Sequence, residues 1–239
     1  MTTPRRRCLF YALILPLFLL VAPARSADFY VAVTGTNGPG TLANPWSPEI
    51  AVTNALHGPG DTLYVRGGIY SKSNGLVPRI INITRGGTGD AARIQWLNYP
   101  GENPIFWGSV NIAASNVTVE GFEITNPVQA ATRTNLVSLL PGGVSIDGTN
   151  VWLQFCYIHD CGNLGIGLWN DDQYGTKLVG NIIERVGLFD TEFGFNAWRA
   201  SGLYLQGRFG KPLVKGNIVG RQSTTTMKAY AQGGYADGF

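Results

Sequence analysis

One phrase occurs twice in this chain: LVGNIIERVG at residues 178–187 returns as LVKGNIVGRQ at residues 213–222. The same frame of alternating apolar residues, interrupted near a small or turn residue and then resumed, starts at Val117 and again at Val151. The frame is marked by Gly121, Phe155, Gly180 and Gly216, with spacings of 34, 25 and 36 residues. A unit of this length cannot bury its own apolar face, so successive units must stack and share one core.

Each repeat is predicted to contain three short strands. The frame reads as two strands joined by a bend, and a third strand follows in the segments GVSID, GIGLW, GLYLQ and TMKAY. The 32 glycines and the scarcity of helical periodicity favour the same all-β class. We predict a three-strand solenoid in which each strand pairs with its equivalent in the next repeat and Asn181 stacks on Asn217. A β-sandwich whose strands resemble one another by chance is the alternative.

The first 26 residues read as a secretory signal peptide. Three arginines precede an apolar run at residues 9–22, which is shorter than the roughly 20 residues needed to span a bilayer. Small residues place the cleavage site after Ser26, and an uncleaved membrane anchor is the alternative. We therefore expect a periplasmic or secreted protein with no membrane span after cleavage.

The positive charge of the chain belongs to this leader. Residues 1–26 hold four arginines and no acid, so their removal changes the formal charge from +3 to −1. No basic stripe or arginine-aromatic run remains, which argues against nucleic acid as a partner.

Two cysteines, Cys156 and Cys161, remain beyond the leader. In an oxidising compartment they could close a local disulfide, and a buried Cys156 with an unpaired Cys161 fits the sequence equally well. A metal site made by both cysteines with His159 is a third interpretation.

Residues 27–239 are predicted to form one domain, with a cap at about 27–60 and coils over 61–239. Ser47 is the expected N-cap and Pro48 the first residue of a short helix, whose apolar segment Ile50 to Leu56 would cover the first rung. The chain finishes in MKAYAQGGYADGF without a capping helix or polar tail, so we expect the array to be incomplete at its carboxyl end.

Several segments together carry a family resemblance: GTLANPW, PGDTLYVRGGIY, YPGENPIF, NVTVEGFEIT and CYIHDCGNLGIGL. With the signal peptide, they resemble the opening coils of right-handed parallel β-helix proteins of the pectin-lyase-like superfamily, and most nearly the lysine-base pectate lyases. The resemblance covers essentially the whole chain beyond the leader. It implies a right-handed parallel β-helix and is only weakly specific for the reaction, because this scaffold carries several chemistries.

The third strand of each repeat is expected to present the site. Its inward residues are Val144, Ile166, Leu203 and Met227, so their neighbours point outward. One outward column comprises Ser145, Gly167, Tyr204 and Lys228; the next comprises Asp147, Trp169, Gln206 and Tyr230. Aromatic faces beside polar groups suit a bound polysaccharide. An ordinary solvated sheet face is the alternative.

Two long excursions, residues 125–142 and 188–200, lead into this strand and are expected to rim the same face. The second contains Arg199 within a mixed acidic and basic set suited to a glycan. The alternative is that its phenylalanines pin the loop to the barrel.

The resemblance also implies a chemistry, β-elimination of an acidic glycan such as pectate or alginate. It needs a base and positive charge near the uronate. Lys228, the only lysine on the outward columns, is our candidate base or carboxylate-binding cation. The segment YADGF resembles the calcium-binding ADGF segment of these lyases, which assigns a calcium ligand to Asp237, although one aspartate cannot complete a site. His159 is expected to be a turn residue leaving the second strand.

Two functions therefore remain open. One is a secreted polysaccharide lyase; the other is a noncatalytic carbohydrate-binding or surface-adhesion β-helix module that uses the same groove. A hydrolase would need paired carboxylates, and Asp147 with Asp171 or Asp172 is the available pairing.

Overall fold

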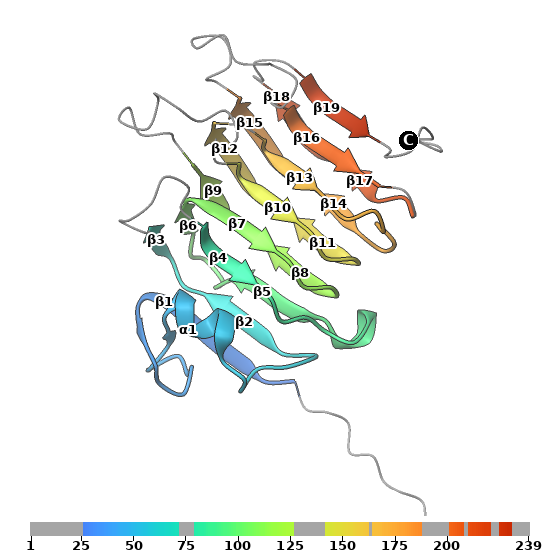
Figure 1. Ribbon diagram of the computed structural model, residues 1–239. Coiled ribbons are helices and arrows are strands. Elements are labelled where there is room, and N and C mark those ends of the chain that lie inside the picture. The colour runs from blue at the N-terminus through green and yellow to red at the C-terminus, as the bar shows by residue number, and fades with distance from the viewer. Residues whose placement is uncertain are drawn as a thin grey trace, which may run out of the picture.

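The computed structural model describes residues 26–71, 79–126, 142–162, 164–187, 201–207, 210–220 and 225–230. Its strands form three parallel sheets (Figure 1). Sheet A contains β1 (Asp28–Thr36), β2 (Thr62–Val65), β5 (Ile94–Asn98), β8 (Val117–Glu120), β11 (Val151–Gln154), β14 (Lys177–Val179) and β17 (Leu213–Lys215). Sheet B contains β3 (Gly68–Ser71), β6 (Pro104–Trp107), β9 (Glu123–Thr125), β12 (Tyr157–Cys161), β15 (Ile182–Val186) and β18 (Ile218–Gly220). Sheet C contains β4 (Arg79–Ile83), β7 (Ser109–Ile112), β10 (Val144–Ile146), β13 (Ile166–Leu168), β16 (Ser201–Gln206) and β19 (Thr225–Tyr230).

From β2 onward the chain visits sheets A, B and C in strict succession, so three strands make one turn of a coil. The register confirms the alignment of the repeats: Thr118 lies beside Trp152, Trp152 beside Lys177, and Lys177 beside Leu213. Every pairing between these described strands is parallel, which rules out the β-sandwich alternative. The predicted three-strand solenoid is confirmed.

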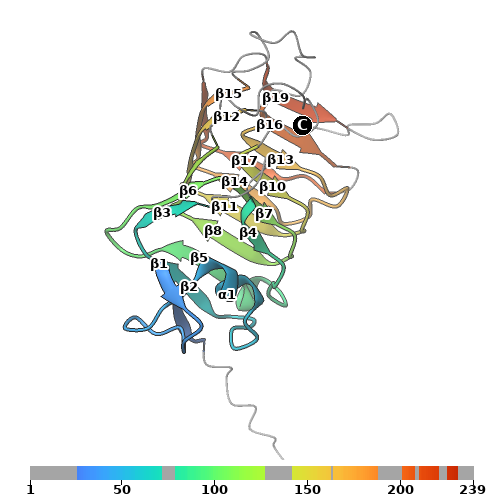
Figure 2. The same ribbon diagram turned by 60° about the vertical axis from the view of Figure 1, so that its left-hand side comes forward.

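Inward side chains from all three sheets form one continuous core. Tyr70, Phe106 and Phe122 stack along the axis, with neighbouring ring centroids 4.9 Å apart in both pairs. Above them, Ile124, Ile158 and Ile183 lie in register and are fully buried. Figure 2 shows the strands of sheets B and C on either side of those of sheet A, around this core. Each rung thus buries its apolar face only through its neighbours.

The bend between sheets A and B explains why the repeat carries a small residue there. Gly121, Phe155, Gly180 and Gly216 all adopt positive φ, between 54° and 74°. This left-handed conformation costs glycine little, and Phe155 adopts it without that advantage. The ring of Phe155 lies over Gly180, where an added Cβ would come within 2.7 Å of it. The phase interruption seen in the sequence is therefore a bend of the backbone.

The residue after this bend forms the predicted asparagine ladder. Asn181 is completely buried, and its Nδ2 donates to Asn217 Oδ1 at 2.9 Å and to Leu153 O at 2.9 Å. Its Oδ1 accepts from Cys156 N at 3.0 Å, and Asn217 Nδ2 donates to Leu178 O at 2.8 Å. Each amide therefore satisfies backbone groups of the rung before it, and Asn181 also bonds to the rung after it.

A short helix lies at the amino-terminal end of the array. Helix α1 (Pro48–Thr53) packs against β1 and β4, with Ala51 fully buried (Figure 1). Ser47 is its N-cap, because Ser47 Oγ accepts from Ile50 N at 3.4 Å, and Pro48 opens the helix as predicted. The helix ends at Thr53, and Leu56, at the end of the segment expected to cover the first rung, is exposed. A single 3₁₀ turn, η1 (Asp90–Ala92), precedes β5.

None of the helices in the described part of the chain combines the length and apolar character needed to cross a membrane.

Cys156 and Cys161 are buried free thiols, so the disulfide interpretation is wrong. Cys156 and Cys161 contact backbone carbonyls two residues before them, Gln154 O at 3.4 Å and His159 O at 3.3 Å. Burial raises the pKa of each thiol to about 12. A group with so high a pKa stays protonated at neutral pH and is a poor nucleophile.

We accordingly expect neither thiol to react with an aromatic disulfide reagent in the native protein lacking residues 1–26. Both should react once the chain is unfolded in denaturant, because burial alone protects them. The absorbance of the released thiolate counts the reacting groups, and fast labelling of the native protein would contradict the structure.

Candidate functional site

The outward face of sheet C carries the first predicted column in register. It runs through Asn82, Asn111, Ser145, Gly167, Tyr204 and Lys228. The predicted members align as expected, and two asparagines from β4 and β7 extend the column. Asn111 Nδ2 donates to Asn82 Oδ1 at 2.7 Å, while Asn111 Oδ1 is buried without a hydrogen-bond partner. The alternating pattern of β4 and β7 could have revealed both asparagines in the sequence.

Trp169 does not stay in the second column, where the alternation placed it. Its indole folds back over Gly167, where an added Cβ would lie 2.8 Å from Trp169 Nε1. The indole then packs against Tyr204, with ring centroids 4.9 Å apart and an interplanar angle of 33°. Trp169 remains 40% exposed. Gly167 thus makes room for a two-ring aromatic surface on sheet C that strand alternation alone does not predict.

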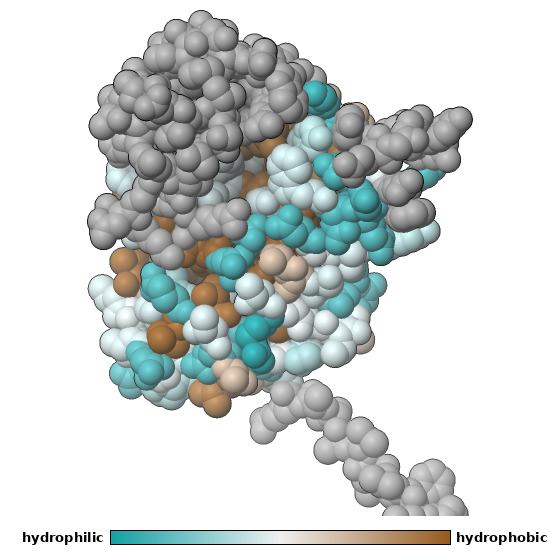
Figure 3. All heavy atoms as spheres, in the orientation of Figure 1, coloured by the Kyte–Doolittle hydropathy of each residue, from teal (hydrophilic) through white to brown (hydrophobic). Residues whose placement is uncertain are grey.

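Polar residues occupy neighbouring positions on sheet C. Lys228 and Gln206 are both half-buried. Lys228 lies beside Tyr204 in register, and Gln206 lies beside Tyr230. The side chain of Tyr230 is not among those described. Asp147 is exposed just after β10, and its carbonyl accepts from Asn170 Nδ2 at 2.7 Å. Figure 3 shows hydrophobic patches scattered among hydrophilic residues on the face seen in Figure 1.

Other predicted elements of the site lie outside the described residues. These are Arg199, Asp237, the whole of the excursion 188–200 and residues 127–141 of the other excursion. Met227 keeps the inward register of Leu203 but is 48% exposed, because β19 is the edge strand of the described sheet.

Asp172, one member of the acidic pair after β13, has a local role. Asp172 Oδ1 accepts from Tyr174 N at 3.0 Å, and Asn170 Oδ1 accepts from Asp172 N at 3.0 Å, which closes the turn. Asp171 Oδ1 is buried without a partner. The carboxylate of Asp172 therefore serves the backbone of this turn.

Calcium needs several oxygen ligands converging on one point. Within the described ranges, no three His, Cys, Asp or Glu residues come together in a way that could hold a metal ion. Asp237, the calcium ligand that the resemblance assigns, lies outside the described residues, so the calcium site stays a prediction. The interpretation of Cys156, Cys161 and His159 as metal ligands is wrong, because these three described residues form no such group.

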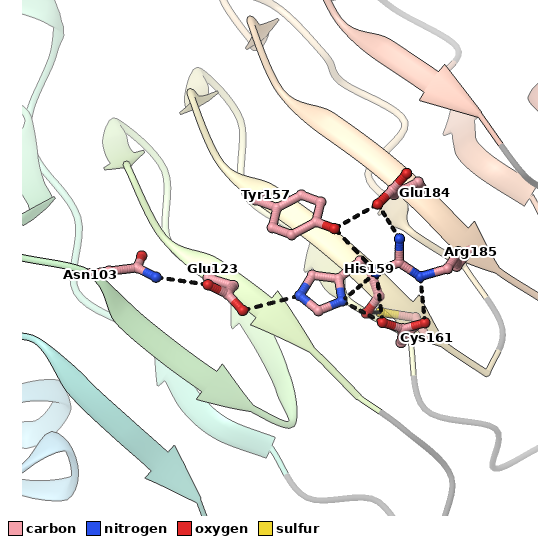
Figure 4. A network of polar contacts seen from close by, with 8 residues as sticks. Asn103, Glu123, Tyr157, His159, Cys161, Glu184 and Arg185 are labelled. Carbon is pink, nitrogen blue, oxygen red and sulfur yellow. Dashed lines mark hydrogen bonds and ion pairs between the residues drawn. The ribbon is translucent and has the colours of Figure 1, made fainter.

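A second polar cluster, absent from our sequence predictions, lies on sheet B (Figure 4). His159 is the third residue of β12 and not a turn residue leaving the strand. Its Nε2 contacts Glu123 Oε1 at 3.2 Å, and its Nδ1 contacts Asp160 Oδ2 at 2.5 Å. The ring of Tyr157 stacks on the imidazole, with centroids 4.2 Å apart. Asn103 Nδ2 donates to Glu123 Oε2 at 2.7 Å, which links the cluster to the rung below.

Arg185 joins the same cluster from the next rung. Its Nε and Nη2 donate to the two oxygens of Asp160, each at 2.8 Å, and Arg185 also pairs with Glu184. The hydrogen bonds from Arg185 hold the pKa of Asp160 below its usual range. Burial and the hydrogen bond to Glu184 raise the pKa of Tyr157.

The charges of the sheet B cluster favour a structural role. Three carboxylates, those of Glu123, Asp160 and Glu184, surround one arginine and one histidine, and each contacts a side chain of the cluster. A polyanionic glycan would meet repulsion here. The cluster instead ties three rungs of sheet B together.

The fold places the chain in the class of parallel β-helix proteins, with a candidate ligand surface on the outward face of one sheet. Residues 29–239 match the sequence profile of the family described as "Pel9A-like, right handed beta helix region". The chain belongs to this family, and its coil is right-handed accordingly.

Solved structures agree on the fold. The chain is similar to a structure titled "Crystal structure of pectate lyase Pel9A", with a TM-score of 0.66, 16% identity, and coverage of 84% of this chain and 50% of that one. It is also similar to "The complex structure of XylC with xylose", with a TM-score of 0.52, 11% identity, and coverage of 84% and 60%. The chain thus spans about half the length of the pectate lyase. No curated protein sequence matches it significantly.

Proposed function

We propose that this chain is part of a secreted, carbohydrate-active β-helix protein that binds an acidic glycan along sheet C and cleaves it by β-elimination. The observation that carries the proposal is the surface on which Trp169 packs against Tyr204, with Lys228 beside Tyr204 in register. Family membership supports it, as does the similarity in fold to a protein named pectate lyase.

The chemistry fits the side chains. In β-elimination a base removes the proton from the carbon that bears the uronate carboxylate, and the released electron pair forms a double bond to the neighbouring carbon. The glycosidic oxygen leaves that neighbouring carbon and takes a proton from solvent. Lys228 supplies the base or the cation that stabilises the carboxylate as charge develops. The rings of Trp169 and Tyr204 hold the CH-rich faces of the sugars.

Secretion rests on the leader: an arginine-rich start, a short apolar run and small residues before the cleavage site after Ser26. Calcium as a cofactor, with Asp237 as a ligand, rests on the YADGF resemblance alone.

The test is digestion of polygalacturonate and alginate by the protein lacking residues 1–26, with calcium or with a chelator, followed by the ultraviolet absorbance of the unsaturated product. Lys228→Ala should lower the rate at least about 100-fold, the lower end of the range for a general base. Lys215→Ala removes an exposed lysine from sheet A and should leave the rate unchanged. Equal rates for the two variants would contradict the role of Lys228.

The second candidate function is a noncatalytic binding or adhesion module, and a binding measurement beside the same assay distinguishes it from a lyase. Retention of the protein in gels containing polygalacturonate, without any unsaturated product, would favour that module. Neither retention nor product from either glycan would overturn the proposal in both forms. The two-ring surface favours binding in either case.

A further inference from the structure

A second aromatic surface lies on sheet A, at the amino-terminal rungs. Tyr30 of β1 and Tyr64 of β2 are paired in register, and Tyr99 follows β5 on the same face. The centroids of their three rings are 5.8, 6.0 and 6.2 Å apart. All three side chains are half-buried, in contrast to the core tyrosine Tyr70. We call Tyr30, Tyr64 and Tyr99 the tyrosine triad.

An ion pair extends the triad along the strands. The guanidinium of Arg66 lies over the ring of Tyr99, 4.7 Å from its centroid. Arg66 Nε donates to both oxygens of Glu102, at 3.0 and 2.9 Å, and Arg66 Nη2 donates to Glu102 Oε1 at 2.6 Å. Hydrogen bonds from Arg66 and from the backbone of Gly67 hold the pKa of Glu102 below its usual range. The cation of Arg66 is therefore matched by a carboxylate.

An open surface pocket of about 420 Å³ adjoins the triad, and Arg66 and Glu102 line it. Exposed Val33 and Ile69 supply apolar wall, and Gly68, with φ of +139°, leaves space where a Cβ would come within 2.9 Å of Val33 Cγ2. Because Arg66 both lies over Tyr99 and lines the pocket, it connects the triad to the pocket.

The polar groups of this surface are available to a ligand. Within the described residues, no hydrogen bond engages the phenol hydroxyls of Tyr30, Tyr64 and Tyr99, and Arg66 Nη1 makes none either. By contrast, the hydroxyl of buried Tyr70 donates to Arg66 O at 2.7 Å. Half-buried rings with hydroxyl donors and a guanidinium beside them suit a sugar chain, whose CH faces pack on rings while its hydroxyls need partners.

We propose that the tyrosine triad and its pocket bind a neutral polysaccharide chain, at a site separate from the sheet C surface. A neutral ligand follows from the charges. The cation on this surface is neutralised by Glu102, and Asp28, whose field adds to burial in raising the pKa of Tyr64, is an acid. A uronate carboxylate would find no unmatched cation among these residues, whereas a neutral pyranose needs none.

This site has a consequence that does not depend on catalysis. Sheet A and sheet C are different faces of the coil, so one polymer could be held on the triad while another lies along Trp169 and Tyr204. The two surfaces would hold the protein in a mixed matrix of neutral and acidic glycans. Because attachment would be bivalent, the protein would stay bound longer than through either surface alone.

The test is affinity electrophoresis of the protein lacking residues 1–26 in gels that contain xylan, a mixed-linkage β-glucan or polygalacturonate. We expect retardation by at least one neutral polymer. The double variant Tyr64→Ala/Tyr99→Ala should weaken it at least about tenfold, because each ring contributes a stacking contact. Tyr64→Phe/Tyr99→Phe keeps the rings, so its affinity for the neutral polymer should fall by less, through the loss of the hydroxyl hydrogen bonds alone.

Two controls make the outcome specific. Tyr174→Ala removes a tyrosine that is 66% exposed outside the triad and should bind the neutral polymer as the parent does. Trp169→Ala should also leave neutral binding intact, and should weaken binding to polygalacturonate if the proposed function holds. Circular dichroism and the urea midpoint verify that each variant is folded.

Three results would overturn the proposal. The parent protein could show no retardation by either neutral polymer, or the folded double alanine variant could bind as the parent does. The triad variants could instead change self-association in sedimentation without changing glycan binding, which would assign the surface to a protein partner. A failure of polygalacturonate binding or cleavage would count against the proposed function alone.

Discussion

Replacing Asn181 by alanine is expected to lower the free energy of unfolding by about 4 kcal/mol, because several buried polar groups lose their partners at once. Cys156 N and Leu153 O would keep no side-chain partner at the bend, and Asn217 would lose the amide stacked on it. Water cannot replace these bonds, since Asn181 is completely buried. Urea denaturation followed by far-ultraviolet circular dichroism measures the change.

Asn217→Ala is the matched control, because the same amide one rung further along is only half-buried. Its removal takes the acceptor from Asn181 N and Nδ2, but solvent can enter the half-buried space that the side chain leaves, so we expect a smaller loss of about 1 kcal/mol. Equal losses for the two variants, or a smaller loss for Asn181→Ala than for Asn217→Ala, would contradict the larger contribution assigned to the buried amide of Asn181.

Gly165→Ala should be the second large effect, with a loss of about 3 kcal/mol through overpacking. The added Cβ would lie 2.5 Å from Ile183 Cγ2 and 2.6 Å from Gly202 O, and the backbone of the next rung cannot move aside without breaking its ladder. Gly165 directly precedes β13, so the strain would also reach the strand that carries Gly167 and the Trp169 stack.

Gly58→Ala provides the comparison, since an added Cβ there meets no atom within 4 Å. Its stability should stay within about 0.5 kcal/mol of the parent or rise slightly, because alanine restricts the unfolded chain. Thermal and urea unfolding give the free energy of unfolding of both variants. A Gly165→Ala protein as stable as the parent would mean that adjacent rungs pack less closely at Gly165 than the structure shows.

The repetition in the sequence predicted more of the fold than any single residue could. Aligning Val117 with Val151 predicts which strands pair, because parallel stacking puts equivalent positions side by side. The same alignment predicts the contact between Asn181 and Asn217, and Ser47 followed by Pro48 predicts the start of α1. These features depend only on local pattern and on the repeat.

The features that the sequence did not predict depend on side-chain conformation across rungs. Trp169 occupies the space above Gly167, which alternation assigns to a different column. His159 contacts Glu123, 36 residues earlier, and both cysteines remain thiols although both are buried within one strand and its preceding bend. Lys228 takes its predicted place beside Tyr204, and its chemical role stays a prediction.

The succession of sheets A, B and C has a kinetic consequence. Partners in sheet A are 34, 25 and 36 residues apart from β8 to β17, so each new strand closes a loop of modest length onto a surface that already exists. All-β proteins usually fold slowly because they pair distant segments, whereas here every rung templates the next. Folding should therefore nucleate at one rung and propagate along the axis, and a defect at Asn181 or Gly165 would halt the growing edge as well as weaken the finished stack.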